Sequence, residues 1–408
     1  MPDRRIFVAI PLLNELNELP ELLDCLSNQE AKAIHILFCV NQSDDWHSLP
    51  DKKDIIQANT VSIEYLKKQN HLPLIILDRS SKGNGWIGKK HGVGWARKAL
   101  LDLASDLASP DDILISLDAD TRFSKNYFSS IISSFNAFPK AIALSNPYYH
   151  KLSGDELLDR SILRYEIYMR SYAINLLRIQ SPYAFTALGS AIAVLNSAYK
   201  KIGGITPKLS GEDFYFLQKL CKAGIVNICN DESVYPGTRY SERVYFGTGP
   251  ALIKGSQGDW DSYPVYHPSL FDTIHNAYEL FPALFENPEL VCSNDFLKFH
   301  FNDATIFHKI KKNNNNINQF TKACHELLDG LKILQFVKQE QNKIVTTEEN
   351  CLWDLLEKYP SCFNQILAKD LNKISFSSSP VHLLNKLRDH LVLLEKQLQN
   401  EHMTSLRK

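Results

Sequence analysis

Four short apolar runs in the first 120 residues alternate with segments that have helical periodicity. The runs occupy residues 6–10, 34–40, 74–78 and 113–117, and polar or turn-forming residues follow each of them. Strands that are apolar on both faces and separated by helices of this length are typical of βαβ units. The alternation therefore predicts an α/β fold, with a mainly parallel sheet flanked by helices.

The composition is that of an ordinary globular chain, with 44% hydrophobic and 22% charged residues among 408. The formal net charge of -1 supplies no positive field, so we expect no nucleic-acid partner. No window holds 18 uncharged apolar residues, and we expect no transmembrane segment. The eight cysteines form no C-x-x-C, and the N-terminus lacks the apolar length of a signal peptide. These features favour a cytoplasmic location, with peripheral contact at a membrane as the alternative.

The character of the sequence changes near residue 255. Glycine becomes rare beyond this point, and helix-like segments dominate up to the C-terminus. Leucines at helical spacing in residues 379–399 form one apolar stripe, which predicts an amphipathic helix. We therefore expect an α/β domain over residues 1–255 and an α-helical C-terminal extension of unknown function over residues 256–408.

Two aspartates follow the fourth apolar run directly. Asp118 and Asp120 are one residue apart, so in an extended chain their carboxylates point the same way, roughly 6–7 Å apart. Mg²⁺ commonly takes one or two carboxylates together with substrate phosphates. The pair predicts either a divalent metal site at the carboxyl end of the strand or an aspartate-rich turn before the next helix.

A glycine-rich segment, residues 80–94, connects the third run to the following helix. Residues 83–88 fit the dinucleotide pattern G-x-G-x-x-G, but the preceding turn is long. A Lys-Lys-His sequence then follows, where a dinucleotide site would need close packing of helix on strand. We interpret the segment as a loop that presents Lys82, backbone N–H groups and Arg97 to phosphates.

Glu212 and Asp213 follow Ser210-Gly211 at the start of a predicted helix. One interpretation is a capping box, with Ser210 as N-cap and Asp213 in place of the usual glutamate. The other is a general base, since a carboxylate can accept a proton from an attacking hydroxyl. The second interpretation depends on Asp118 and Asp120 lying nearby.

Two arginines and a histidine complete the candidate residues. Arg239 and Arg243 flank Ser241, and the planar guanidinium group matches phosphate oxygens well; a generic surface loop is the alternative. His267, in Tyr266-His267-Pro268, is either a metal ligand or a structural histidine. The other histidines show no spacing typical of zinc sites.

In their order along the chain, four motifs resemble those of the family 2 glycosyltransferases with the GT-A fold. The resemblance covers roughly residues 4–253 and consists of PLLNE (11–15), like P-x-x-N-E; KKHGVGWAR (89–97), like G-x-G-x-A-R; DAD (118–120), like D-x-D; and GG (203–204) with GED (211–213), like G-G…E-D. That family moves a sugar from a nucleotide-sugar to an acceptor with inversion of the anomeric carbon. The resemblance therefore implies a GT-A fold and a metal-dependent, inverting glycosyltransferase of the hexosyltransferase class.

The resemblance also implies roles for individual residues. Asp120 and Asp118 would bind Mn²⁺ or Mg²⁺, Asp213 would be the base, and Glu212 would help to hold the donor sugar or the acceptor. Together with the phosphate loop proposed above, the expected contacts to the nucleotide-diphospho-sugar donor are Pro11, Leu12, Asn14, Glu15, Asn41, Lys82, Arg97, Asp118, Ala119, Gly189, Ser190 and Arg243. The acceptor, a glycan, a lipid-linked molecule or a small molecule, is not specified.

The chain departs from the family pattern in two places. Asn41 stands where many members carry an aspartate after the second strand. The Q-x-x-R-W motif is replaced by Arg243-Val244-Tyr245-Phe246, so we do not expect processive polymer synthesis. Two rival functions stay open at this point: a nucleotidyltransferase that uses the same carboxylates, and a catalytically silent sugar-nucleotide binding or scaffold protein.

Overall fold

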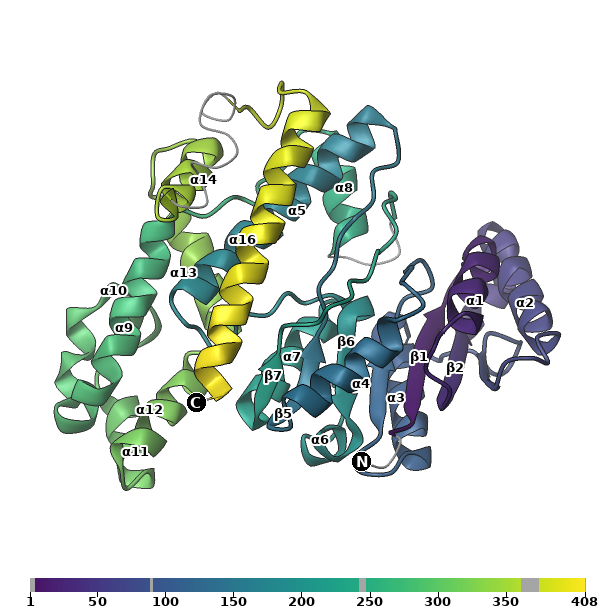
Figure 1. The fold of residues 1–408 in the computed structure, drawn as a ribbon, viewed down its shortest axis with the longest axis horizontal. Coiled ribbons are helices and arrows are strands. Elements are labelled where there is room, and N and C mark those ends of the chain that lie inside the picture. The colour runs from purple at the N-terminus through teal and green to yellow at the C-terminus, as the bar shows by residue number, and fades with distance from the viewer. Residues whose placement is uncertain (1–3, 89–90, 242–246, 361–373, 408) are drawn as a thin grey trace. The chain divides into compact units, whose positions relative to one another are not determined.

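The protein was described from a computed structural model, which covers residues 4–88, 91–241, 247–360 and 374–407 (Figure 1). The chain forms two compact units: unit 1 takes in Met1–Leu158 and Phe185–Lys254, and unit 2 takes in Asp159–Ala184 and Gly255–Leu406. The expected boundary after residue 255 lies beside the crossing between the units from Lys254 to Gly255. Residues 159–184, which the sequence assigned to the first domain, are part of unit 2.

Unit 1 is built on a seven-stranded sheet with the strand order β3-β2-β1-β4-β6-β5-β7. The strands are β1 (Ile6–Leu12), β2 (Ile34–Asn41), β3 (Leu74–Arg79), β4 (Ile113–Ser116), β5 (Ala141–Ser145), β6 (Ile192–Leu195) and β7 (Ile225–Asn227). β6 runs antiparallel to both of its neighbours, and all other neighbouring strands are parallel. The predicted α/β class with a mainly parallel sheet is confirmed.

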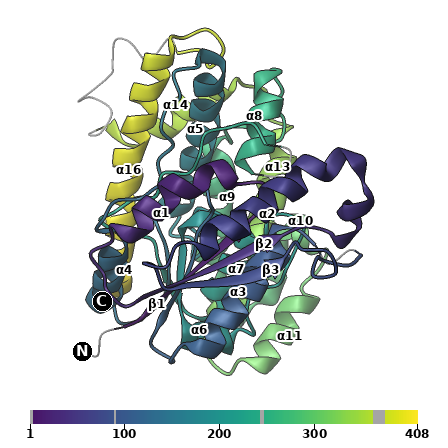
Figure 2. The ribbon, with the colours of Figure 1, turned by 90° about the vertical axis from the view of Figure 1, so that its right-hand side faces the viewer.

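Helices cover both faces of the β1–β3 part of the sheet. α1 and α2 lie over one face and α3 over the other (Figure 2). Right-handed crossovers explain this arrangement, because the chain moves outward from β1 to β3 and then returns past β1 to β4. The helices of unit 1 are α1 (Leu19–Ser27), α2 (Lys53–Lys67), α3 (Val93–Leu107), α4 (Tyr127–Ala137), α6 (Asn196–Lys201), α7 (Glu212–Ala223) and most of α8 (Thr248–Ser256), with short 3₁₀ turns η1 (Leu16–Glu18), η2 (Asp44–Ser48), η3 (Pro50–Lys52) and η4 (Gly189–Ala191).

β1 extends further than its sequence predicts. The apolar run in the sequence ends at residue 10, but β1 continues to Leu12, and Pro11 pairs with Cys39 of β2. On the other side of β1, the pairing with β4 ends where Ala9 lies opposite Ser116. Pro11 thus lies beyond the end of this ladder, so its missing N–H group breaks no bond to β4.

Unit 2 is helical, as predicted for the C-terminal extension. It contains most of α5 (Glu156–Arg178) together with α9 (Pro268–Glu286), η5 (Pro288–Ser293), α10 (Asp295–His300), α11 (Thr305–Asn313), α12 (Ile317–Leu327), α13 (Gly330–Gln341), α14 (Glu348–Leu356) and α16 (Val381–Arg407). The predicted amphipathic stripe is the buried face of α16, whose leucines share one apolar core with Leu163 and Ile167 of α5. None of the helices in the described ranges combines the length and hydropathy that a bilayer-spanning segment requires.

Candidate active site

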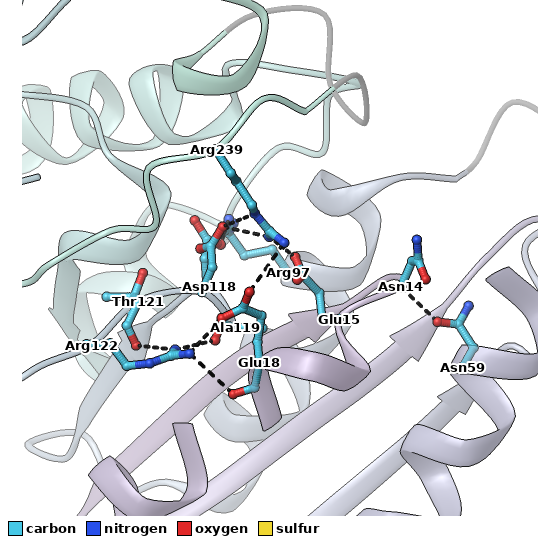
Figure 3. Close-up of polar contacts among 11 residues, drawn as sticks. Asn14, Glu15, Glu18, Asn59, Arg97, Asp118, Ala119, Thr121, Arg122 and Arg239 are labelled. Carbon is cyan, nitrogen blue, oxygen red and sulfur yellow. Dashed lines mark hydrogen bonds and ion pairs between the residues drawn. The ribbon is translucent and has the colours of Figure 1, made fainter. Parts of the chain in front are cut away.

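The predicted donor-binding residues near the N-terminus lie together at the ends of β1 and β2. The Asn41 side chain is buried, and its Nδ2 donates a 2.9 Å hydrogen bond to the carbonyl oxygen of Leu12. Asn14 follows in the left-handed region, with a φ of 56°, and its backbone N–H donates to Asn59 Oδ1 at 2.9 Å (Figure 3). These bonds fix the turn that leads from β1 to Glu15.

Arg97 connects the two acidic motifs of the sequence. Its guanidinium group donates to Asp118 Oδ1 at 2.8 Å and to Glu212 Oε1 at 3.1 Å. It also donates to Ser116 Oγ and, at 2.9 Å, to the carbonyl oxygen of Gly189. A Cβ atom at Gly189 would lie 2.6 Å from Arg97 Nη2, so only glycine permits this approach. The strand end at Asp118 and the start of α7 are therefore held together by one arginine.

Burial and the neighbouring carboxylates shift the pKa of Arg97 in opposite directions. The Arg97 side chain is only 3% exposed, and burial by itself disfavours its charged form. The carboxylates of Asp118 and Glu212 outweigh burial, and the net effect raises the pKa of Arg97. Arg97 is thus a permanent cation whose donors are directed to protein acceptors rather than outward to a phosphate.

Asp213 is placed differently from the predicted capping box. α7 begins at Glu212, and its N-cap is Gly211, with a φ of 75°, where the sequence predicted Ser210. Asp213 is therefore the second helical residue, and its Oδ1 accepts from the neighbouring Phe214 N–H at 2.8 Å. A glycine with positive φ suits this N-cap because a larger residue would be strained there.

Asp213 has the perturbed acidity of a proton-transfer group. Burial first, and then the adjacent Glu212 carboxylate, raises the pKa of Asp213 to about 7, against the opposing effect of Arg97. A carboxyl group with a pKa near neutral pH exchanges protons readily with a substrate hydroxyl. Near neutral pH, Asp213 is therefore present in both its protonated and its ionised form.

Asp120 belongs to a second cluster, centred on Arg239. Arg239 Nη2 donates to Asp120 Oδ2 at 2.7 Å and to Glu15 Oε1 at 2.6 Å, and Nη1 lies 3.6 Å from Glu18 Oε1. Arg122 extends the cluster through Glu18, with a 2.6 Å distance between its Nη2 and Glu18 Oε2. Burial opposes the charge of Arg239, but hydrogen bonding to Glu15 and the charge of Asp120 raise its pKa.

The donor set of this site suits a hard divalent cation in part. Asp118 and Asp120 offer carboxylate oxygens, the ligand type that Mg²⁺ and Mn²⁺ prefer. Within the described ranges, however, no group of three or more His, Cys, Asp or Glu side chains is arranged to hold a metal ion. The residues therefore fit a cation held by one or two carboxylates, whose remaining ligands come from a bound phosphate and water.

The other predicted residues have separate environments. Gly189 and Ser190 are buried in η4, Ala119 is buried between the two aspartates, and Lys82 is exposed in the loop after β3. His267 belongs to unit 2, where its ring contacts Ser269 Oγ at 2.7 Å and Asp354 Oδ2 at 2.9 Å. Its assignment as a metal ligand stays a prediction, and Arg243 lies outside the described residues.

Sequence reasoning identified the acidic residues but missed how they are linked. Arg239 was noted as a candidate phosphate ligand, not as the partner of Asp120 and Glu15. Arg122 was not noted, although it follows the DAD motif by only two residues. Oppositely charged residues far apart in sequence carry no local signal of their pairing, so only the fold reveals these contacts.

Comparison with known proteins adds little to this geometry. No protein-family model matches the chain, and no curated protein sequence matches it. Among solved structures, S. aureus TarS residues 1–349 matches with 12% identity and a TM-score of 0.41, over 98% of this chain and 92% of that one. The mannosyltransferase PcManGT from Pyrobaculum calidifontis, in complex with GDP-Man and Mn²⁺, matches with 12% identity and a TM-score of 0.42, over 96% and 87%. Glucosyl-3-phosphoglycerate synthase from Mycobacterium tuberculosis matches with 14% identity and a TM-score of 0.35, over 62% and 80%. Similarities this distant support no inference about the chain.

Proposed function

We propose that unit 1 is a metal-dependent, inverting glycosyltransferase that moves a sugar from a nucleotide-diphospho-sugar to an acceptor hydroxyl. The observation that supports this most is the bridge through Arg97, which joins Asp118 at 2.8 Å and Glu212 at 3.1 Å. These carboxylates are 94 positions apart in the sequence, and the resemblance to family 2 glycosyltransferases requires that their motifs meet at one site. Had α7 begun on a remote surface, the proposal would have lost its basis.

Asp213 is the base in this proposal. In its ionised form it accepts the proton of the acceptor hydroxyl, whose oxygen attacks the anomeric carbon of the donor sugar. The bond from that carbon to the diphosphate oxygen breaks on the opposite face, and the nucleoside diphosphate leaves with the electron pair. A pKa near 7 keeps a sufficient fraction of Asp213 ionised at neutral pH while leaving it basic enough to take the proton.

The leaving diphosphate is the charge that the site must stabilise. Asp120 and Asp118 would hold a divalent cation, which when bound neutralises the diphosphate oxygens as they gain charge. Arg97 is a positioning residue rather than a phosphate ligand, because its donors already serve protein acceptors. It holds the base-bearing start of α7 in register with the aspartates that follow β4.

A donor panel tests the proposal. The full chain is incubated with Mn²⁺ and UDP-, GDP- or ADP-linked sugars, and the released products are separated by chromatography. Nucleoside diphosphate supports sugar transfer, to water where no acceptor is supplied, and its formation should disappear with Asp213→Asn. Pyrophosphate release would instead identify a nucleotidyltransferase, and saturable binding without any product would identify a silent binding protein. Lys98→Met, on the same helix as Arg97 and at an ion pair with Asp102, is the matched control and should retain turnover.

A further inference from the structure

Arg239 occupies the carboxylate oxygens to which a cation would bind. Its Nε and Nη2 both donate to Asp120 Oδ2, at 3.2 and 2.7 Å. Nη2 also reaches Glu15 Oε1 at 2.6 Å, and Figure 3 shows the guanidinium group lying over Glu15. A guanidinium group cannot share this Oδ2 atom with a metal ion without giving up the hydrogen bonds, because both seek the same lone pairs.

The backbone delivers Arg239 to this position. Tyr235 forms an isolated antiparallel bridge with Arg122, with backbone hydrogen bonds of 2.9 and 2.8 Å. This bridge attaches the segment before Arg239 to the chain just beyond the DAD motif. The arginine is therefore brought to Asp120 by a fixed pairing, while its own side chain is still 32% exposed.

The site is acidic even with its arginines counted. Within the described network, three guanidinium groups face seven carboxyl groups: Arg97, Arg122 and Arg239 against Glu15, Glu18, Glu21, Asp118, Asp120, Glu212 and Asp213. A nucleoside diphosphate carries further negative charge and would be repelled by such a site. Binding it requires an added cation, and the exposed side of the network is where that cation can enter.

The two central arginines differ in accessibility. Arg97 is 3% exposed and cannot leave without stranding Glu212, which is itself 5% exposed. Arg239 is 32% exposed and Asp120 19%, so solvent can replace each of them as a partner of the other. Of these two arginines, Arg239 is the one that can exchange partners at a modest cost in free energy.

We infer that Arg239 is an exchangeable counter-ion: it neutralises Asp120 and Glu15 until a divalent cation binds, and it then pairs with the diphosphate that the cation brings. The second half of this inference rests on the proposed function, and the first half does not. The exchange replaces the single positive charge of the guanidinium group at the carboxylates with the two charges of the cation, and it places a guanidinium fork beside phosphate oxygens.

Binding of Mn²⁺ alone to the full chain tests the first half, by electron paramagnetic resonance of free Mn²⁺ at pH 7.5. Arg239→Gln removes the competitor, so it should bind Mn²⁺ about tenfold more tightly than the wild type, since a charge-assisted hydrogen bond is lost by the competitor. Arg122→Gln removes the same charge from the same cluster but does not contact Asp120 in the hydrogen-bond network, and it should change the affinity less than about threefold. Adding Asp120→Asn to Arg239→Gln should abolish the gain in Mn²⁺ affinity. Unchanged or weaker Mn²⁺ binding in Arg239→Gln would overturn the inference.

Binding of pyrophosphate at saturating Mn²⁺ tests the second half by calorimetry. Here Arg239→Gln should bind about tenfold more weakly than the wild type, the opposite sign from Mn²⁺ alone, which a merely structural role would not produce. Equal pyrophosphate affinities would overturn the exchange onto phosphate. If Arg239→Gln does not fold, Arg239→Met replaces it, since it also removes the charge and the hydrogen-bond donors, and the same two opposite signs are required of it. No sugar and no turnover enters these measurements, so a failure of the donor panel and a failure of this inference are distinguishable.

Discussion

Arg97→Met is the substitution that most directly probes how unit 1 is held together. Methionine fills a similar volume but removes every hydrogen bond that the guanidinium group donates. The change leaves Glu212 buried without its charged partner, and it frees Ser116 and the Gly189 carbonyl from a shared donor. It should therefore destabilise unit 1 and loosen the start of α7 relative to the end of β4.

The magnitude follows from the exposure of the two carboxylates. The Glu212 side chain is 5% exposed, and removing one partner of a buried ion pair typically costs about 3–5 kcal/mol. The Asp118 side chain is 36% exposed and regains water, so its lost pair adds less than about 1 kcal/mol. We expect the free energy of unfolding of unit 1 to fall by about 3–5 kcal/mol. Lys98→Met removes a neighbouring ion pair with 32% and 44% exposed partners, and should cost only about 0.3–0.5 kcal/mol.

Hydrogen exchange measured by mass spectrometry is the suitable assay, because the chain has two compact units and a single melting curve would mix them. Peptides from β1 and β4 report unit 1, and peptides from α16 serve as the internal reference. A double variant, Arg97→Met with Glu212→Gln, should recover part of the loss because it removes the stranded charge. A loss below about 1 kcal/mol in Arg97→Met, or an equal loss in Lys98→Met, would refute the bridging role.

Three further predictions follow from other contacts. Asp120→Asn should abolish Mn²⁺-dependent nucleotide binding, measured by calorimetry, because it removes the proposed metal ligand; unchanged affinity would contradict this role. Asp213→Asn should keep donor binding and lose turnover. Burial raises the folded pKa of Asp213 from 3.8 to about 7, so the stability that its protonated form contributes should fall by about 3 kcal/mol as pH rises from 4 to 7. In Asp213→Asn this pH-dependent loss should be absent from urea titrations, and an identical slope would assign it to another group. In unit 2, Glu166→Gln should destabilise α16 by about 3–5 kcal/mol, as measured by hydrogen exchange, because the fully buried Glu166 accepts from both Arg170 and Arg388. Asp389 is a 47% exposed partner of Arg388, so the control Asp389→Asn should cost less than about 1 kcal/mol.

The sheet of unit 1 was largely predictable because its strands are apolar on both faces. Runs such as residues 6–10 and 113–117 leave few alternatives to a buried strand, and the structure shows β1 and β4 there. The reversed direction of β6 was not predictable, since it depends on which distant strands pair. The apolar run ends before Pro11, two residues before β1 does. Whether a proline ends a strand depends on where the pairing with the neighbouring strand stops, here at Ala9 and Ser116.

Charged residues on α5 show where sequence patterns stop being informative. Glu166 and Arg170 are buried, yet amphipathic patterning treats such residues as a solvent-facing stripe. Their partners on α16, Arg388 and Glu395, lie 222 and 225 positions away. No local signal connects residues at that separation, so the sequence alone does not group residues 159–184 with the C-terminal helices of unit 2. The tyrosines of α5 are packing residues; Tyr165, for example, packs against Tyr263 with the ring centroids 5.2 Å apart.

Contacts between distant residues were also not predictable at the candidate site. The order of the motifs located the acidic residues, and only the structure shows which arginines pair with them. Arg97 and Arg239 both pair with the DAD motif, and a sequence pattern does not separate their roles. Their exposure does: Arg97 is 3% exposed and Arg239 32%. A cation that is buried with its acceptors fixes geometry, because leaving would cost several kcal/mol, whereas a half-exposed cation exchanges with ions from solvent. In the proposed glycosyltransferase, the buried Arg97 fixes the position of the base Asp213, and the exposed Arg239 controls how tightly the metal ion binds.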